Sequence, residues 1–240
     1  MPASERASAR ERLILPLDVP AAEAALALAT RLAGHVGMFK VGLELFVAEG
    51  PRVVERLRER VPDVEIFLDL KLHDIPNTMR GAIRSARRLG ARFITVHTGS
   101  GTAHLAACVE EAEGVVGILG VTVLTSQDEH ACREAGHTRS PEELVPMRAV
   151  CAREAGCAGV VCSGEELPEV RSVAPNLFRV VPGIRPAGAD AGDQARIMTP
   201  ALAIQRGATH LVVGRPITQA PDPTAAADAI VEEIANARPR

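Results

Sequence analysis

The chain has 240 residues, of which 47% are apolar and 24% charged, so it can bury a sizeable core and is neither disordered nor collagen-like. A formal net charge of −3 and an aromatic content of 2%, with no Trp or Tyr, offer no basic, base-stacking surface for a nucleic acid. No apolar run approaches the ~20 residues of a membrane span, and residues 1–12 are polar, so we expect a cytoplasmic protein with neither nucleic acid nor membrane as partner.

Apolar segments of strand length recur along the whole chain. They are Leu13–Leu17, Met38–Val41, Ile66–Leu70, Phe93–His97, Ile118–Leu124, Gly159–Cys162, Phe178–Val181 and Leu211–Val213. Their continuous rather than alternating apolar character is typical of strands buried on both faces, as in a parallel sheet.

The segments between these strands carry helix signals. Residues Ala21–Leu32 are rich in Ala and Leu, and three later helices are predicted to start where a capping residue precedes proline, at Ser140, Thr199 and Asp222. Strands alternating with helices over this length predict a single-domain α/β fold, a (β/α)₈ TIM barrel over residues 1–240, with a doubly wound open sheet as the alternative. Residues 1–12 are expected to form a flexible N-terminal extension.

Two residue types are used unusually. The five cysteines are an odd number without zinc-ligand spacing, which favours buried reduced thiols over disulfides and implies no structural metal.

Only Lys40 and Lys71 among the 27 basic residues are lysine. Because an ammonium group can release a proton and a guanidinium group cannot, we hypothesise that both lysines are functional, against the alternative that two survive by chance.

The residues at the ends of the predicted strands carry the clearest chemical pattern. Asp69 and Lys71 lie two apart on one strand and therefore share a face, with Asp74 three residues further on and Lys40 on the preceding strand. In a barrel these charges meet at the carboxyl ends of the strands, where active sites lie. Such an array can stabilise a developing carbanion and supply a proton, as decarboxylation requires; the alternative is a salt-bridged strand end.

Glycine and arginine follow the last two strands. Gly183 with Arg185 and Gly214 with Arg215 fit a phosphate site, although each pair could also be an ordinary turn with a solvated arginine. The long stretch between Pro186 and Met198 is interpreted as a lid over the ligand.

Other polar residues at strand ends are weaker candidates. Thr125 and Ser126 could bind the amide edge of a heterocycle or simply form a turn. His73, His97 and His210 lack metal-ligand spacing and are interpreted as hydrogen-bonded structural residues.

Taken together, eight segments of the chain resemble the bacterial orotidine 5′-phosphate decarboxylase family. They are DLKLHDIPNT from Asp69, LDVP from Leu17, FKVGLELF from Phe39, VTVLTS from Val121, VVCS from Val160, PGIRP from Pro182, GDQARIMTP from Gly192 and VGRPIT from Val213. The resemblance implies a homodimeric (β/α)₈ barrel that converts orotidine 5′-phosphate to UMP and CO₂, the last step of de novo pyrimidine synthesis, without metal or organic cofactor. Leu72 departs from the aromatic residue of many relatives, and the polar residues 1–12 match nothing in the family.

The resemblance also implies a role for particular residues. Lys71 would protonate the C6 carbanion beside Asp69, and Lys40 would complete the charge array. Asp74 and Thr78 would reach the neighbouring subunit's site. The substrate-binding residues it implies are Asp18, Lys40 and Thr78 for the ribose, Thr125 and Ser126 for the pyrimidine, Arg185, Gln194, Gly214 and Arg215 for the phosphate, and Asp69, Ile75 and Pro182 elsewhere in the pocket.

Two other functions remain open from the sequence. A related barrel acting on a sugar phosphate shares the Asp-x-Lys-x-x-Asp layout but uses magnesium, so metal dependence would distinguish it. A non-catalytic nucleotide-binding barrel is the other, although it would not need the charged cluster of Asp69, Lys71 and Asp74.

Overall fold

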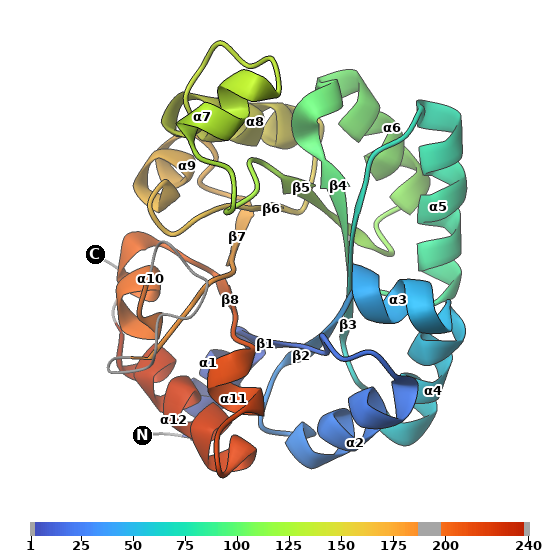
Figure 1. Cartoon of the computed structure of the whole chain (residues 1–240), viewed down its shortest axis with the longest axis vertical. Helices are drawn as coiled ribbons and strands as arrows, with labels where there is room; N and C mark the ends of the chain where they lie inside the picture. The colour runs from blue at the N-terminus through green and yellow to red at the C-terminus, as the bar shows by residue number, and fades with distance from the viewer. Residues whose placement is uncertain (1–2, 187–197, 238–240) are drawn as a thin grey trace.

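The computed structural model describes residues 3–186 and 198–237. Its parallel strands close into a barrel in chain order, with helices around the outside (Figure 1). The strands are β1 (Leu13–Pro16), β2 (Met38–Gly42), β3 (Ile66–Leu72), β4 (Phe93–His97), β5 (Gly117–Val121), β6 (Gly159–Val161), β7 (Phe178–Val181) and β8 (His210–Val212). The predicted (β/α)₈ barrel is confirmed, and the open-sheet alternative is wrong because β1 pairs with β8.

Helices follow the strands and cover the barrel. They are α1 (Ala3–Glu11), α2 (Ala22–Leu32), α3 (Leu43–Glu49), α4 (Arg52–Arg60), α5 (Pro76–Arg88), the 3₁₀ helix η1 (Thr98–Ser100), α6 (Thr102–Ala112), α7 (Glu129–Glu134), α8 (Pro141–Glu154), α9 (Leu167–Val173), α10 (Pro200–Arg206), α11 (Arg215–Thr218) and α12 (Pro223–Asn236). Within the described ranges, no helix combines the length and apolar character needed to cross a membrane.

The three helix starts predicted from capping residues are confirmed. The Glu143 carboxylate accepts a hydrogen bond from the Ser140 N–H at 3.1 Å, Thr199 Oγ1 accepts one from Leu202 N–H, and Asp222 Oδ1 accepts one from Thr224 N–H. In each helix proline is the first residue, where its missing N–H leaves no donor unpaired.

The N-terminal residues differ from the expectation of a flexible extension. Residues Ala3–Glu11 form helix α1, which packs against α12 beside the start of β1. The segment is rich in Ala, Glu and Arg, which are strong helix formers, and a docked partner stabilises a helix too short to persist alone.

The barrel interior is built in layers. Toward the amino-terminal ends of the strands the layer is apolar and consists of Ile14, Met38, Phe67, Phe93, Leu119, Val180 and Val212. Because side chains two residues apart share a face, the next inward residues on β2, β3 and β4 are Lys40, Asp69 and Thr95. The apolar layer is therefore the floor of a polar layer at the carboxyl ends of the strands.

The five cysteines are free thiols, as predicted, and four of them are buried. Burial raises the pKa of Cys157 and of Cys162 to about 12, so these thiols stay protonated near neutral pH.

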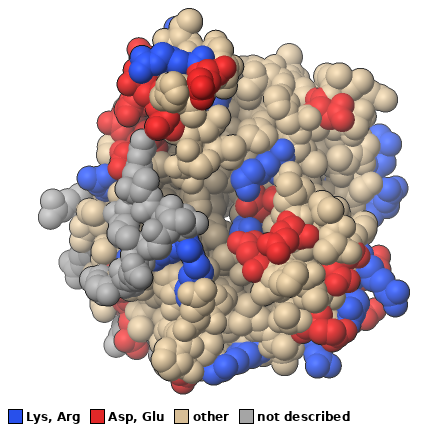
Figure 2. Space-filling model, viewed as in Figure 1, with Lys and Arg blue, Asp and Glu red and all other residues tan. Residues whose placement is uncertain are grey.

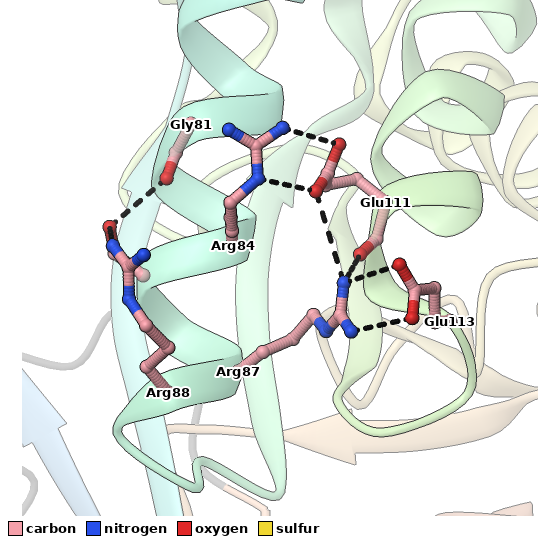
Figure 3. A network of polar contacts seen from close by, with 7 residues as sticks. Gly81, Arg84, Arg87, Arg88, Glu111 and Glu113 are labelled. Carbon is pink, nitrogen blue, oxygen red and sulfur yellow. Dashed lines mark hydrogen bonds and ion pairs between the residues drawn. The ribbon is translucent and has the colours of Figure 1, made fainter.

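Ion pairs join α5 to α6 on the outside of the barrel (Figure 3). Arg84 binds both carboxylate oxygens of Glu111, at 2.9 and 3.1 Å. Arg87 binds both oxygens of Glu113 and also donates to the Glu111 carbonyl at 2.9 Å. These forked contacts link α5 to the end of α6, and α5 begins directly after the loop that carries Asp74.

His210 lies at the amino-terminal end of the barrel. Its ring centroid is 5.1 Å from that of Phe178 and 6.1 Å from that of Phe93. Burial, and then the charges of Arg12 and Arg92, lower the pKa of His210 to about 4. In the unfolded chain this pKa is about 6.5, so between these values the unfolded state binds a proton that the folded state does not.

We therefore expect acid to destabilise the fold through His210. The free energy of unfolding should fall by about 3 kcal/mol from this residue as the pH drops from 7 to 4. Urea unfolding across this range measures the effect, and His210→Phe is the comparison, because His97 and His104 also have lowered pKa values and act in the same direction. Equal pH dependence in both proteins would contradict the prediction.

Candidate active site

A cavity of about 360 Å³ opens at the carboxyl ends of the strands. Figure 2 shows acidic and basic side chains gathered around a hollow in the middle of this face. The cavity brings together the predicted site residues Asp18, Lys40, Asp69, Lys71, Thr125, Pro182, Arg185, Gly214 and Arg215. This end of the barrel is where enzymes of this fold carry their active sites.

A larger cavity, of about 700 Å³, lies at the opposite end of the barrel. It is lined by Arg10, Arg12 and Arg92 and by three acidic residues, so its charges of the two signs balance. In this fold the amino-terminal end serves stability, and we place the candidate site in the smaller cavity.

Four charged side chains form a continuous chain along one wall of the candidate site. Lys40 Nζ lies 2.9 Å from Asp18 Oδ1 and 3.5 Å from Asp69 Oδ2, and Lys71 Nζ lies 2.8 Å from the same Asp69 Oδ2. Acid and base alternate, so each buried charge faces an opposite one. Lys40 is only 7% exposed, whereas Lys71 reaches toward the open cavity.

Asp69 is the centre of this chain. Burial by itself raises the pKa of its carboxyl group, but the charges of Lys40 and Lys71 and the hydrogen bonds from Lys71 and Thr95 outweigh burial. The pKa of Asp69 therefore lies below its ordinary value, and the carboxylate stays ionised between the two ammonium groups.

The end of β3 is irregular where it carries these residues. Leu68 pairs with Ile94 and Leu72 with Val96, so four residues of β3 span the length of two on β4. Lys71 has a φ of 47°, in the left-handed region that costs a side-chain-bearing residue roughly 1–3 kcal/mol. Such strain persists only where the surroundings enforce it.

The opposite wall is formed by the ends of β7 and β8. Gly183 has a φ of 77°, which turns the chain so that Arg185 is buried beside the cavity. Arg215 is exposed at the first turn of the short helix α11, which follows Gly214. The loops after strands 7 and 8 and a short extra helix are where this fold commonly binds phosphate, and guanidinium groups match phosphate oxygens with two parallel hydrogen bonds.

A family model described as "Orotidine 5'-phosphate decarboxylase / HUMPS family" matches residues 11–230. The chain belongs to this family. A protein of Moorella thermoacetica named orotidine 5′-phosphate decarboxylase is 49% identical over 239 residues, covering 95% of this chain and 94% of its own. A relative of the same name from Anaeromyxobacter sp. (strain K) is 51% identical over 221 residues, covering 92% and 96%.

Solved structures of the family share the barrel. The crystal structure of orotidine 5′-phosphate decarboxylase from Lactobacillus acidophilus superposes with a TM-score of 0.82 at 34% identity, covering 92% of this chain and 98% of its own. The enzyme of that name from Pyrococcus horikoshii OT3 gives a TM-score of 0.74 at 31% identity, with the same coverage. The resemblance seen in the sequence motifs is confirmed.

Not every predicted site residue faces the cavity. Asp74, Ile75 and Thr78 are exposed on the loop after β3 and the first turn of α5, outside the cavity lining. Asp74 Oδ1 accepts a hydrogen bond from the Ile75 N–H at 2.6 Å. Ser126 is exposed and, unlike Thr125, does not line the cavity. Gln194 and residues 187–197 of the proposed lid lie outside the described residues.

His73 and His97 lie on the β3 and β4 side of the site but do not line its cavity. His73 Nε2 lies 2.7 Å from Ser100 Oγ, and the His73 and His97 rings are 5.6 Å apart. Burial, and then the charges of His73, Lys71 and Arg148, lower the pKa of His97 below its ordinary value. Across residues 3–186 and 198–237 no three His, Cys, Asp or Glu side chains are grouped to hold a metal ion.

Two residues of the candidate site were not predicted from the sequence. Thr218 of α11 lines the cavity, and its only signal was its place in the VGRPIT segment. Thr95 is fully buried in β4 and hydrogen-bonds to Asp69 Oδ1 at 3.0 Å. The signal for Thr95 was a polar residue on the inward face of an otherwise apolar strand, two positions before His97.

Proposed function

We propose that this chain is a carboxy-lyase that converts orotidine 5′-phosphate to UMP and CO₂, the last step of de novo pyrimidine synthesis, without a metal or organic cofactor. The observation that carries the proposal is the chain of Asp18, Lys40, Asp69 and Lys71, which ends in an ammonium group at the cavity. Membership of the family and relatives of that name at about half identity support it.

The reaction requires stabilisation of a negative charge and then a proton. When the carbon–carbon bond breaks, CO₂ leaves and the electron pair stays on C6, in the plane of the ring, where it cannot delocalise into the π system. Lys71 stabilises that pair through its charge and then transfers a proton from Nζ to C6. Asp69 holds Lys71 Nζ at 2.8 Å and lies beside the departing carboxylate.

The remaining predicted site residues account for substrate binding. Arg185, Gly214 and Arg215, together with Gln194, bind the phosphate, and Pro182 lines the pocket beside them. Asp18 and Lys40 bind the ribose, and Thr125 with Ser126 binds the pyrimidine. Contacts to a phosphate far from C6 contribute to the rate when their binding energy organises the charged wall.

We further propose a homodimer in which Asp74 and Thr78 reach the neighbouring subunit's site. Leu43 and Val47 on α3 and Ile75 beside Asp74 are apolar side chains that are each more than half exposed. In Figure 1, α3 lies next to the end of β3, so these residues and the Asp74 loop share one rim of the barrel. A contact across this rim buries the apolar side chains and carries Asp74 to a second site.

Mixing two inactive variants tests the shared site. Lys71→Ala and Asp74→Ala should each be nearly inactive alone, but subunits exchanged between them should recover about one quarter of wild-type activity, since half the dimers then hold one intact site. The rate of decarboxylation, measured before and after the two variants are mixed, gives the recovered activity. No recovery, with exchange verified by mass, would contradict the shared site.

The reaction itself is tested by following the loss of ultraviolet absorbance of orotidine 5′-phosphate with EDTA present. Turnover that survives the chelator supports the proposal. Turnover that requires magnesium would favour the sugar-phosphate barrels that share this charge layout. Tight UMP binding with no turnover would favour a non-catalytic nucleotide-binding barrel.

A further inference from the structure

The irregular end of β3 leaves one main-chain group without its regular partner. In a regular parallel pair the Lys71 N–H would meet a main-chain carbonyl on a neighbouring strand, but here β3 contains two residues more than β4 between the pairs at Leu68 and Leu72. The Lys71 N–H instead donates to Thr95 Oγ1 at 2.8 Å. A side-chain hydroxyl on β4 thus takes the place of a ladder hydrogen bond.

The same hydroxyl also acts as a donor. It has one proton, and since its oxygen accepts from Lys71, that proton goes to Asp69 Oδ1 at 3.0 Å. The other carboxylate oxygen, Asp69 Oδ2, faces Lys71 Nζ at 2.8 Å and Lys40 Nζ at 3.5 Å. Each oxygen of Asp69 therefore has its own partners, which fixes the plane of the carboxylate.

Thr95 cannot act by touching a ligand. Its side chain is fully buried and it does not line the cavity. Its two hydrogen bonds end on the main chain of Lys71 and the carboxylate of Asp69, so one hydroxyl connects the backbone of the proton donor to the group that holds its ammonium.

We propose that Thr95 is a positioning residue that holds the left-handed backbone of Lys71 and the plane of the Asp69 carboxylate, so that Lys71 Nζ meets the reacting carbon. The proposal rests on the proposed function, in which Lys71 is the proton donor. A displacement of about 1 Å in such a group is enough to lower a rate by up to ~100-fold.

Thr95→Val tests the proposal because it keeps the shape of the side chain and removes the hydroxyl. We expect kcat to fall roughly 10- to 100-fold while KM changes less than about twofold, since binding groups at the phosphate end are untouched. Thr95→Ser, which keeps the hydroxyl, should restore kcat to within about threefold. Thr95→Cys, with a weak donor of similar size, should lie between them and carries the test if the valine variant does not fold.

Two buried threonines at neighbouring strand ends provide matched controls. Thr98 Oγ1 and Thr122 Oγ1 each donate at 2.8 Å to a main-chain carbonyl, and neither contacts the charged chain. Their valine variants should lose stability without the selective loss of kcat. Amide exchange of the Lys71 N–H, measured by NMR, should be faster in Thr95→Val than in either control.

The outcomes separate the two proposals. A kcat for Thr95→Val within about twofold of wild type, an equal loss in Thr95→Ser, or an equal loss in Thr122→Val would each overturn the role of Thr95. Absence of turnover by the wild-type protein would instead overturn the proposed function. The role of Thr95 in holding the Lys71 backbone would still be tested, because unchanged exchange of the Lys71 amide in Thr95→Val would contradict it.

Discussion

Replacement of Lys71 by alanine is expected to lower kcat by roughly 10⁴- to 10⁶-fold, because in the proposed reaction Lys71 is both the proton donor and the charge that stabilises the carbanion. Each effect alone is worth about two to four powers of ten. Single-turnover decarboxylation of orotidine 5′-phosphate measures the loss without a contribution from product release.

Lys71→Arg is the matched comparison for this prediction. It keeps the positive charge next to Asp69 but cannot release a proton near neutral pH, so it should retain substrate binding and remain severely impaired in kcat. UMP binding measured by calorimetry verifies that both variants keep the site. Activity of Lys71→Ala within about tenfold of wild type would show that another group supplies the proton.

Replacement of Arg215 by alanine is expected to lower kcat/KM by roughly 10- to 100-fold, the usual range for a charge-assisted contact to phosphate. Part of the loss should appear in kcat, because in the proposed reaction phosphate binding organises the charged wall on the other side of the cavity. Steady-state kinetics that separate kcat from KM provide the measurement.

Two controls isolate the phosphate contact. Orotidine, which lacks the phosphate, should be decarboxylated equally slowly by wild type and Arg215→Ala. Arg52→Ala changes an exposed arginine on α4 and should leave both kinetic constants unchanged. A raised KM with unchanged kcat would mean that Arg215 contributes only ground-state binding.

The sequence alone determined the features that depend on neighbouring residues. Buried strands read as continuous apolar runs, and the helix starts at Ser140, Thr199 and Asp222 follow from side chains that cap N–H groups two or three residues away. The two-residue repeat of a strand predicted a common face for Asp69 and Lys71, and both residues line the cavity. The irregular end of β3 sets how they meet there. These interactions are short in sequence, so their patterns are visible without a fold.

Only the tertiary structure decided which groups from different strands meet. Lys40 lies between Asp18 and Asp69, and Thr95 reaches across to Lys71, because the barrel closes with a particular register that shifts at the end of β3. Residues 3–11 form a helix because α12, from the other end of the chain, packs against them. Register and packing are set by contacts between residues far apart in sequence, and no local pattern in one chain records them.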